Sequence, residues 1–275
     1  MGKATVIIQA RMGSTRLPGK IFMPLPFGGE ATVLQQVCRR VSESPAVEQI
    51  VIATTENHTD AVVAEWAENN NYFCFRGSQD DVLDRYYHAA VRFGADPVIR
   101  ITSDCPCIDS SVISDMIRAY PKSGADYLSN SIERTFPHGL DTEIFSFAAL
   151  EQAWEAAVLQ PHREHVTPYI YRSGFFNCKS YTNEEAAPED AKIRVTLDTR
   201  EDYILLCAVY GLLGETFSGK DLVKLFKTHN WLRMINENIM QKKTYDSIKD
   251  EITDAVKLLQ MQDMPNAVTV LKNSL

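Results

Sequence analysis

The sequence has no apolar run long enough to cross a membrane, and its first residues lack the apolar stretch of a signal peptide. Basic residues are in the minority, since 28 lysines and arginines face 36 aspartates and glutamates, for a net charge of −8. Nucleic acids and anionic membrane surfaces both require a basic face. These absences predict a cytoplasmic protein that binds neither nucleic acid nor membrane.

Cysteines are few and scattered. The six are Cys38, Cys74, Cys105, Cys107, Cys178 and Cys207. Disulfides are not expected in a chain with cytosolic character. The Cys105-Pro106-Cys107 spacing is too short and too isolated for a zinc site. We expect reduced thiols with a mainly structural role.

Segments with strand and helix character alternate along most of the chain. Strands are expected at residues 5–9, 49–53, 72–75, 97–102 and 194–197, and helices at 32–41, 60–69, 81–93, 110–119 and 201–213. This alternation predicts an α/β fold with a doubly wound, mostly parallel sheet. Residues 126–182 differ, with short aromatic segments among turns. Beyond residue 216 we expect a helical C-terminal extension without a catalytic constellation.

A basic loop over residues 9–20 follows the first predicted strand. It contains two glycines and the cations Arg11, Arg16 and Lys20. Glycines let backbone N–H groups approach a ligand, and the cations suit phosphate oxygens. The loop matches neither the Walker A nor the dinucleotide-binding pattern, and a solvated basic turn is the alternative. Because open α/β sheets bind nucleotides at the carboxyl ends of strands, the position favours a polyphosphate site.

Several segments, taken in their order along the chain, are similar in sequence to motifs of a known protein family. They are residues 9–20, 75–87, 99–106, 137–143, 163–168 and 194–203. In these segments the chain resembles the cytidylyltransferases that make CMP-activated acidic sugars, such as the acylneuraminate and 3-deoxy-manno-octulosonate cytidylyltransferases. The likeness is greatest to relatives described as spore coat polysaccharide biosynthesis protein F. It implies the nucleotide-diphospho-sugar transferase type of fold and a reaction that uses CTP and Mg²⁺.

The resemblance assigns CTP contacts to the loop. Arg11 and Lys20 would contact the β- and γ-phosphates, with Arg16 adding charge. Gly13 and Ser14 would lend backbone donors.

The resemblance assigns recognition of the pyrimidine base to residues near the ends of the first and third predicted strands. Backbone groups of Gln9 and Ala10, together with Arg76 or Ser78, would read the base. A helix N-cap at Ser78 or Asp80 is the alternative for that segment.

Two aspartates, Asp104 and Asp198, each follow a predicted strand. Mg²⁺ prefers oxygen ligands and usually takes one or two carboxylates, with phosphates and waters completing its octahedron. The family's metal-binding aspartates match these two positions. The resemblance therefore makes them the metal ligands and, with Arg11 and Lys20, the catalytic set. A turn or helix-capping role is the alternative for Asp104, and Asp202 is expected only to begin the next helix.

Acceptor-binding carboxylates are expected at Asp141 and Glu143. Side chains alternate along an extended segment, so these two fall on one side and can accept hydrogen bonds from sugar hydroxyls.

Arginines are the expected partners of an acceptor carboxylate. Arg163 and His165 would meet it, with a surface pair between Arg163 and Glu164 as the alternative. Arg134 and Arg194 add guanidinium groups in the same region, and a guanidinium can grip a carboxylate with two parallel bonds.

By this resemblance, residues 1–215 form a nucleotidyltransferase domain, of which residues 126–182 cover the sugar and supply dimer contacts. Residues 216–275 form the extension. The expected homodimeric enzyme transfers CMP from CTP to a nonulosonate-like sugar acid for polysaccharide or glycan biosynthesis, releasing pyrophosphate. The alternatives are a nucleotidyltransferase for an alditol phosphate or a phosphonate, and a non-catalytic nucleotide-binding partner.

Overall fold

The computed structural model describes residues 3–239 and 247–273. These residues form a seven-stranded sheet in the order β3-β2-β1-β4-β6-β5-β7. The strands are β1 (Lys3–Gln9), β2 (Gln49–Thr55), β3 (Phe73–Gly77), β4 (Ala95–Thr102), β5 (Tyr127–Ser129), β6 (Glu143–Phe145) and β7 (Cys178–Ser180). Strand β6 runs antiparallel to β4 and β5, and the other neighbours are parallel. The predicted doubly wound, mostly parallel α/β fold is confirmed.

Helices surround this sheet and continue beyond it. The α-helices are α1 (Val33–Ser42), α2 (Ala61–Asn69), α3 (Val82–Phe93), α4 (Ser110–Ser123), α5 (Phe147–Ala156), α6 (Gln160–His165), α7 (Pro168–Arg172), α8 (Arg200–Leu213), α9 (Gly219–Thr228), α10 (Ile248–Met261) and α11 (Pro265–Lys272). Short 3₁₀ helices are η1 (Lys20–Phe22), η2 (His58–Asp60), η3 (Asp190–Lys192) and η4 (Asn230–Ile235). None of the helices in the described part of the chain has the length and apolar character that a membrane span requires.

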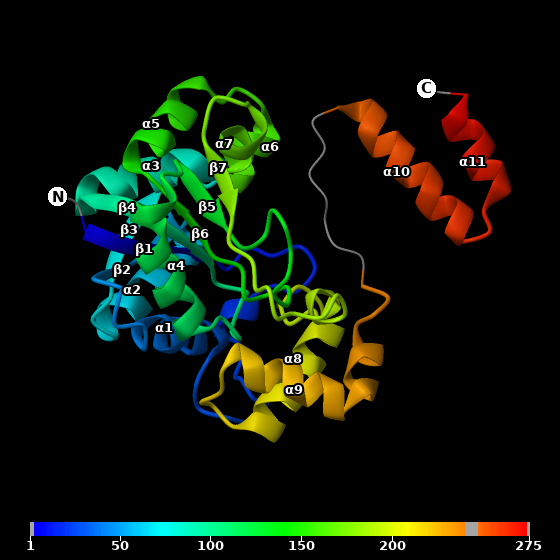
Figure 1. Ribbon diagram of the computed structural model, residues 1–275, viewed down its shortest axis with the longest axis horizontal. Helices are drawn as coiled ribbons and strands as arrows, with labels where there is room; N and C mark the ends of the chain where they lie inside the picture. Colours follow the sequence, from blue (N-terminus) through cyan, green and yellow to red (C-terminus); the bar gives the residue numbers. More distant parts are fainter. Residues whose placement is uncertain (1–2, 240–246, 274–275) are drawn as a thin grey trace.

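The central strand β1 is buried on both faces, which explains its unbroken apolar run. Val6 and Ile8 pack in one core with residues of α1, α2 and α4. Ile7 points to the opposite face and packs with residues of α3, α5 and α7. Figure 1 shows the sheet between these two helical layers. Because β1 lies between β2 and β4, its end falls within the carboxyl edge of the sheet, where open α/β folds bind their ligands.

The C-terminal extension has two parts. Leu222 and Phe226 of α9 share a buried cluster with Leu205 and Val209 of α8, so the first part is built onto the sheet domain. Helices α10 and α11 pack against one another as a hairpin, which Figure 1 shows to one side of the sheet. The helical extension is confirmed for the described residues, while residues 240–246 and 274–275 of it lie outside them. The domain division at residue 215 stays a prediction.

Candidate active site

The basic loop after β1 closes on itself before η1. The N–H of Gly19 donates to the carbonyl of Met12 over 3.1 Å, and Gly19 has a φ of 70°, a conformation that favours glycine. The N–H of Met12 donates to Asp60 Oδ1 over 2.6 Å, which fastens the loop to the start of α2. These contacts hold Lys20, the first residue of η1, at the carboxyl edge of the sheet.

Lys20 brings the two predicted aspartates together. Its Nζ lies 3.0 Å from Asp104 Oδ2 and 3.0 Å from Asp198 Oδ1, and it also donates to the carbonyl of Leu197 over 2.6 Å. The Lys20 side chain is only 12% exposed, whereas those of Asp104 and Asp198 are 27% and 22% exposed. Both carboxylates therefore remain open to a ligand approaching from solvent.

Residues 194–197 do not form the predicted sheet strand. They run alongside residues 137–139, to which they are joined by a single parallel bridge between His138 and Arg194. The Cβ of any other residue at Gly139 would lie 2.7 Å from the carbonyl carbon of Val195, so only glycine permits this approach. The N–H of Leu197 donates to the carbonyl of Asp104 over 2.8 Å. This bond, rather than a strand end, places Asp198 beside Asp104.

Electrostatic effects stabilise the charged forms of this cluster. Burial opposes the charge of Lys20, but Asp104 and Asp198 outweigh it and raise the pKa of the ammonium. Burial likewise disfavours the Asp198 carboxylate, yet Lys20, Arg194 and Arg16 lower its pKa. Arg16 Nη2 lies 3.2 Å from Asp198 Oδ2. Lys20 and Arg16 thus lie beside the two carboxylates at the edge of the sheet, where their charges suit the oxygens of a polyphosphate.

The donor set fits a divalent cation of the magnesium type. Three oxygen atoms, from Asp104, Asp198 and the carbonyl of Leu197, surround the ammonium of Lys20. Within residues 3–239 and 247–273 no cluster of three or more acidic, histidine or cysteine side chains forms a complete metal site. Two carboxylates completed by phosphate oxygens and waters are the usual protein contribution to Mg²⁺ binding.

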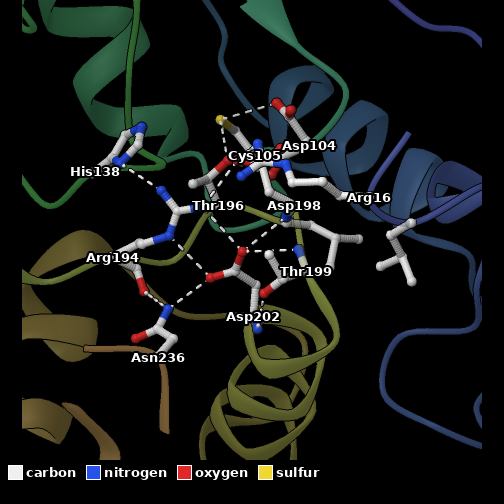
Figure 2. A network of polar contacts seen from close by, with 12 residues as sticks. Arg16, Asp104, Cys105, His138, Arg194, Thr196, Asp198, Thr199, Asp202 and Asn236 are labelled. Carbon is white, nitrogen blue, oxygen red and sulfur yellow. Dashed lines mark hydrogen bonds and ion pairs between the residues drawn. The ribbon is translucent and has the colours of Figure 1, made fainter. Parts of the chain in front are cut away.

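Behind Asp198 lies a buried layer that the sequence did not indicate (Figure 2). Arg194 donates through Nε and Nη2 to both oxygens of Asp202, each over 3.0 Å, and through Nη2 to Asp198 Oδ2 over 2.9 Å. Asp202 lies in the first turn of α8 and forms a capping box with the N-cap Thr199, in keeping with its expected place at the start of this helix, but its carboxylate also accepts from Arg194. Asn236, at the end of η4, donates to Asp202. No local pattern in the sequence marks Asn236.

The segment 137–141 contacts Arg194 at Nη1, the nitrogen that does not bond to Asp198 or Asp202. Nδ1 of His138 lies 3.4 Å from Arg194 Nη1, and Nε2 of His138 lies 3.4 Å from Asp141 Oδ2. Burial lowers the pKa of His138, although Asp141 favours the charged imidazole. Arg134 forms an ion pair with Asp141. Asp141 is thus connected to the candidate metal site through His138 and Arg194, and its acceptor-binding role stays a prediction.

Glu143 does not share these partners. It is 7% exposed and lies on β6 opposite Arg100 of β4, with which it forms an ion pair. Its Oε1 also accepts hydrogen bonds from the hydroxyls of Tyr127, over 2.5 Å, and Thr167, over 2.6 Å. Both oxygens of Glu143 are therefore engaged within the fold, on contacts that join β4, β5 and β6.

Arg163 and His165 lie on α6, away from Asp141 in the contact network. Nε and Nη2 of Arg163 both donate to Oδ2 of Asp81, over 2.8 and 2.6 Å. Asp81 is the N-cap of α3, so Arg163 joins α6 to α3. The alternative partner Glu164 is not the carboxylate that Arg163 contacts here. His165 is the half-buried last residue of α6.

The remaining loop residues are exposed or half-buried. Arg11 and Gly13 are exposed, and a Cβ at Gly13 would meet no atom within 4 Å. Ser14 is half-buried, and its hydroxyl accepts from the N–H of Leu17 over 3.4 Å. A side chain at position 13 would fit without a clash. The role proposed for Gly13 is therefore to donate a backbone hydrogen bond to phosphate.

Arg76 joins β3 to the end of β2, and Ser78 lies in the turn between β3 and α3. Arg76 donates from Nε to the carbonyl of Thr55 over 3.0 Å and from Nη2 to that of Asn57 over 3.1 Å. The hydroxyl of Ser78 accepts from the N–H of Asp81 over 3.1 Å, but Asp81 is the N-cap of α3, so the N-cap considered at Ser78 or Asp80 lies one residue beyond that pair. Both residues border the carboxyl ends of β2 and β3.

Gln9 and Ala10 end β1 between its two neighbours. The carbonyl of Gln9 accepts from the N–H of Ser103 over 3.3 Å, and the N–H of Ala10 donates to the carbonyl of Ala53 over 3.1 Å. Among the described residues, Oε1 of Gln9 is one of the buried side-chain oxygens with no hydrogen-bond partner. Gln9 therefore retains an acceptor at the site edge, while the named backbone groups are used by the fold.

Comparison with known proteins identifies the family of this chain. The cytidylyltransferase family profile matches residues 5–212. The spore coat polysaccharide biosynthesis protein SpsF of Bacillus subtilis strain 168 is 32% identical over 232 residues, which cover 82% of this chain and 94% of SpsF.

Two solved structures extend the comparison. A cytidylyltransferase from Leptospira borgpetersenii is 35% identical, with a TM-score of 0.77, covering 88% of this chain and 99% of its own. CMP:2-keto-3-deoxy-manno-octonic acid synthetase, solved with CTP, aligns with a TM-score of 0.57 over 77% of this chain and 99% of its own. Its identity is 14%, so that likeness concerns the fold alone. The profile match, the sequence identities and the shared fold together make this chain a member of the cytidylyltransferase family of CTP-dependent nucleotidyltransferases.

Proposed function

We propose that this enzyme transfers CMP from CTP to a hydroxyl group of a nonulosonate-like sugar acid, releasing pyrophosphate, in polysaccharide or glycan biosynthesis. The observation that carries the proposal is the position of Lys20, whose Nζ lies 3.0 Å from both Asp104 and Asp198 at the carboxyl edge of the sheet. Cations next to paired carboxylates are what nucleotidyl transfer needs, because the triphosphate must be neutralised and the α-phosphate polarised.

In this proposal the acceptor oxygen attacks the α-phosphorus of CTP. The new oxygen–phosphorus bond forms as the bond to the bridging oxygen breaks, and pyrophosphate leaves. Arg11, Arg16 and Lys20 hold the β- and γ-phosphates, and the backbone of Gly13 and Ser14 adds donors. Holding the reactants in line lowers the entropic part of the barrier.

Asp104 and Asp198 are the proposed ligands of Mg²⁺. When bound, the cation supplies Lewis-acid polarisation of the α-phosphate. Gln9, Ala10, Arg76 and Ser78 remain the proposed base-reading residues, since all four border the carboxyl ends of β1, β2 and β3.

We assign the acceptor to the region around Asp141, which His138 connects to Arg194. Of the three candidate arginines, Arg163 and Arg194 each have a carboxylate within the fold that takes two of their donors, and their side chains are 17% and 9% exposed. Arg134 is 27% exposed and pairs with Asp141 through one nitrogen. We assign the acceptor carboxylate to Arg134 and the hydroxyl proton to Asp141. Glu143 and Arg163 are engaged within the fold by Arg100 and Asp81, so we assign no acceptor contact to them or to His165.

The wider arrangement is part of the same proposal. Residues 1–215 carry the chemistry, residues 126–182 cover the sugar and form the dimer contacts, and residues 216–275 form the extension. Because its nucleotide substrate is CTP, we place the homodimer in the cytoplasm.

The test is pyrophosphate release from CTP and Mg²⁺ with a panel of acceptors, comprising 2-keto sugar acids, an alditol phosphate and a phosphonate. The expected result is release with a sugar acid, with CTP preferred over the other nucleoside triphosphates and no release from Asp198→Asn. Release with the alditol phosphate or phosphonate alone would replace the acceptor assignment. Nucleotide binding without release for any acceptor would favour a non-catalytic role.

A further inference from the structure

The carboxylate of Asp202 is completely buried and accepts five hydrogen bonds. Its Oδ2 receives Arg194 Nη2 and the N–H groups of Asp198 and Thr199, each over 3.0 Å. Its Oδ1 receives Arg194 Nε over 3.0 Å and Asn236 Nδ2 over 2.8 Å. Asp202 thus holds both the backbone of Asp198 and the arginine that contacts the Asp198 side chain (Figure 2).

Asn236 is the member of this network that comes from the C-terminal extension. It is 5% exposed, and its Nδ2 donates both to Asp202 Oδ1 and to the carbonyl of Arg194, over 2.8 and 3.2 Å. One amide group therefore ties the side chain of Asp202 to the main chain of Arg194. It lies beyond residue 212, where the match to the family profile ends.

We infer that Asn236 is a positioning residue for the candidate metal ligand Asp198, acting through Asp202 and Arg194. The inference rests on the proposed metal-dependent function. Without the Asn236 donor, Oδ1 of Asp202 loses one of its two partners and the backbone of Arg194 loses its side-chain tether. Arg194 keeps its two hydrogen bonds to Asp202, but the pair is then less tightly restrained relative to Asp198 Oδ2, which lies 2.9 Å from Arg194 Nη2. Mutation of a residue that hydrogen-bonds to a metal ligand from behind typically lowers metal affinity or activity by roughly ten- to a hundredfold.

This role differs measurably from simple stabilisation of the fold. In the described part of the chain, Asn236 donates its hydrogen bonds to Asp202 and Arg194 and none to Asp104 or the phosphate loop, so its removal is expected to leave metal-free nucleotide binding unchanged. A purely structural residue would lower the melting temperature without a selective change in metal affinity. A positioning residue changes metal affinity even where the variant remains folded.

The experiment compares Asn236→Leu, which keeps the size but removes the donor, with Asn236→Ala, which avoids overpacking. Asn230→Leu is the matched control, since Asn230 is exposed on the same element, η4. The probe is Mn²⁺, which takes the same oxygen ligands as Mg²⁺. Its binding is measured by electron paramagnetic resonance on the full chain saturated with an α,β-methylene analogue of CTP, against a nucleotide-only blank. Metal-free affinity for the analogue is measured in parallel.

The expected result is a fall in Mn²⁺ affinity of on the order of tenfold in both Asn236 variants, with affinity for the analogue within about twofold of wild type and Asn230→Leu unchanged. Wild-type Mn²⁺ affinity in a folded Asn236 variant would overturn this inference and leave the proposed function standing. Absence of Mn²⁺ binding by the wild-type complex would overturn the proposed metal-dependent function and the inference with it.

Discussion

The N–H of Leu197 donates to the carbonyl of Asp104 over 2.8 Å, and this bond joins the two segments that carry the candidate metal ligands. Asp104 follows β4 in the sheet, whereas Leu197 belongs to an extended segment outside it. Thr196 strengthens the same junction, because its hydroxyl donates to the Asp104 carbonyl over 3.2 Å. The spacing of the two carboxylates is thus set by main-chain geometry and does not depend on Lys20 alone.

Replacing the loop cations is expected to weaken CTP binding. Lys20→Met and Arg11→Ala each remove charge-assisted hydrogen bonds worth about 1.5–3 kcal/mol, which corresponds to a roughly ten- to hundredfold loss of affinity. Isothermal titration with CTP measures the effect. Lys192→Met is the control, since Lys192 forms an exposed pair with Glu189. Wild-type affinity in both loop variants would contradict the phosphate-site assignment.

Neutralising either aspartate is expected to stop turnover while nucleotide still binds. Asp104→Asn and Asp198→Asn each remove one of the two carboxylates, so transition-state stabilisation by the cation is lost and the rate falls by roughly a hundredfold or more. Pyrophosphate release gives the rate, and titration in EDTA gives metal-free CTP binding. Asp115→Asn, in an exposed pair with Arg118, should retain full activity. A wild-type rate that EDTA leaves unchanged would rule out the metal mechanism.

The stability of the protein is expected to depend on Asp202 in a pH-dependent way. Burial opposes the Asp202 carboxylate, but hydrogen bonds from Arg194 and Asn236 and the charge of Arg194 lower its pKa. A group with a lowered pKa stabilises the fold above its unfolded pKa of about 3.9, and that stability is lost as the pH falls through the folded value. Asp202→Asn should therefore cost about 3–5 kcal/mol near neutral pH.

Urea unfolding of the Asp202→Asn variant and the wild type, from pH 7 down to pH 3, measures this dependence. The difference in unfolding free energy should be greatest near neutrality and should narrow below about pH 4. A difference that stays constant across this range would show that Asp202 contributes through packing and not through its charge.

Recognition of an acceptor carboxylate is expected to require Arg134. For a sugar acid and its carboxamide analogue at saturating CTP, the wild type should prefer the acid in kcat/KM by roughly tenfold or more, as one charge-assisted bond implies. Arg134→Gln should remove most of that preference and leave CTP affinity unchanged. Equal kcat/KM for the two acceptors in the wild type would instead favour the alditol phosphate or phosphonate as substrate.

Local patterns in the sequence were sufficient for the inner sheet and for part of the site. The apolar run of Val6, Ile7 and Ile8 indicates a strand buried on both faces, because its side chains alternate between two helical layers. Asp104 could be placed at the sheet edge because it comes two residues after the end of β4. Each of these inferences depends on residues adjacent in the chain.

The tertiary structure decided the partners of the charged side chains. Glu143 and Arg163 were expected at the acceptor, yet they pair with Arg100 and Asp81, which lie on elements distant in the sequence. Charge pairs form where folding brings two segments together, and periodicity does not encode which segments meet.

The sequence by itself determined that this chain has an α/β sheet, a basic loop at the end of its first strand and two aspartates in family positions. Only the tertiary structure decided that residues 194–197 leave the sheet, and that Asn236 reaches Asp202 and Arg194 from η4. The physical reason is that helices and strands follow from local spacing and burial, whereas a buried polar network requires donors and acceptors to meet in three dimensions.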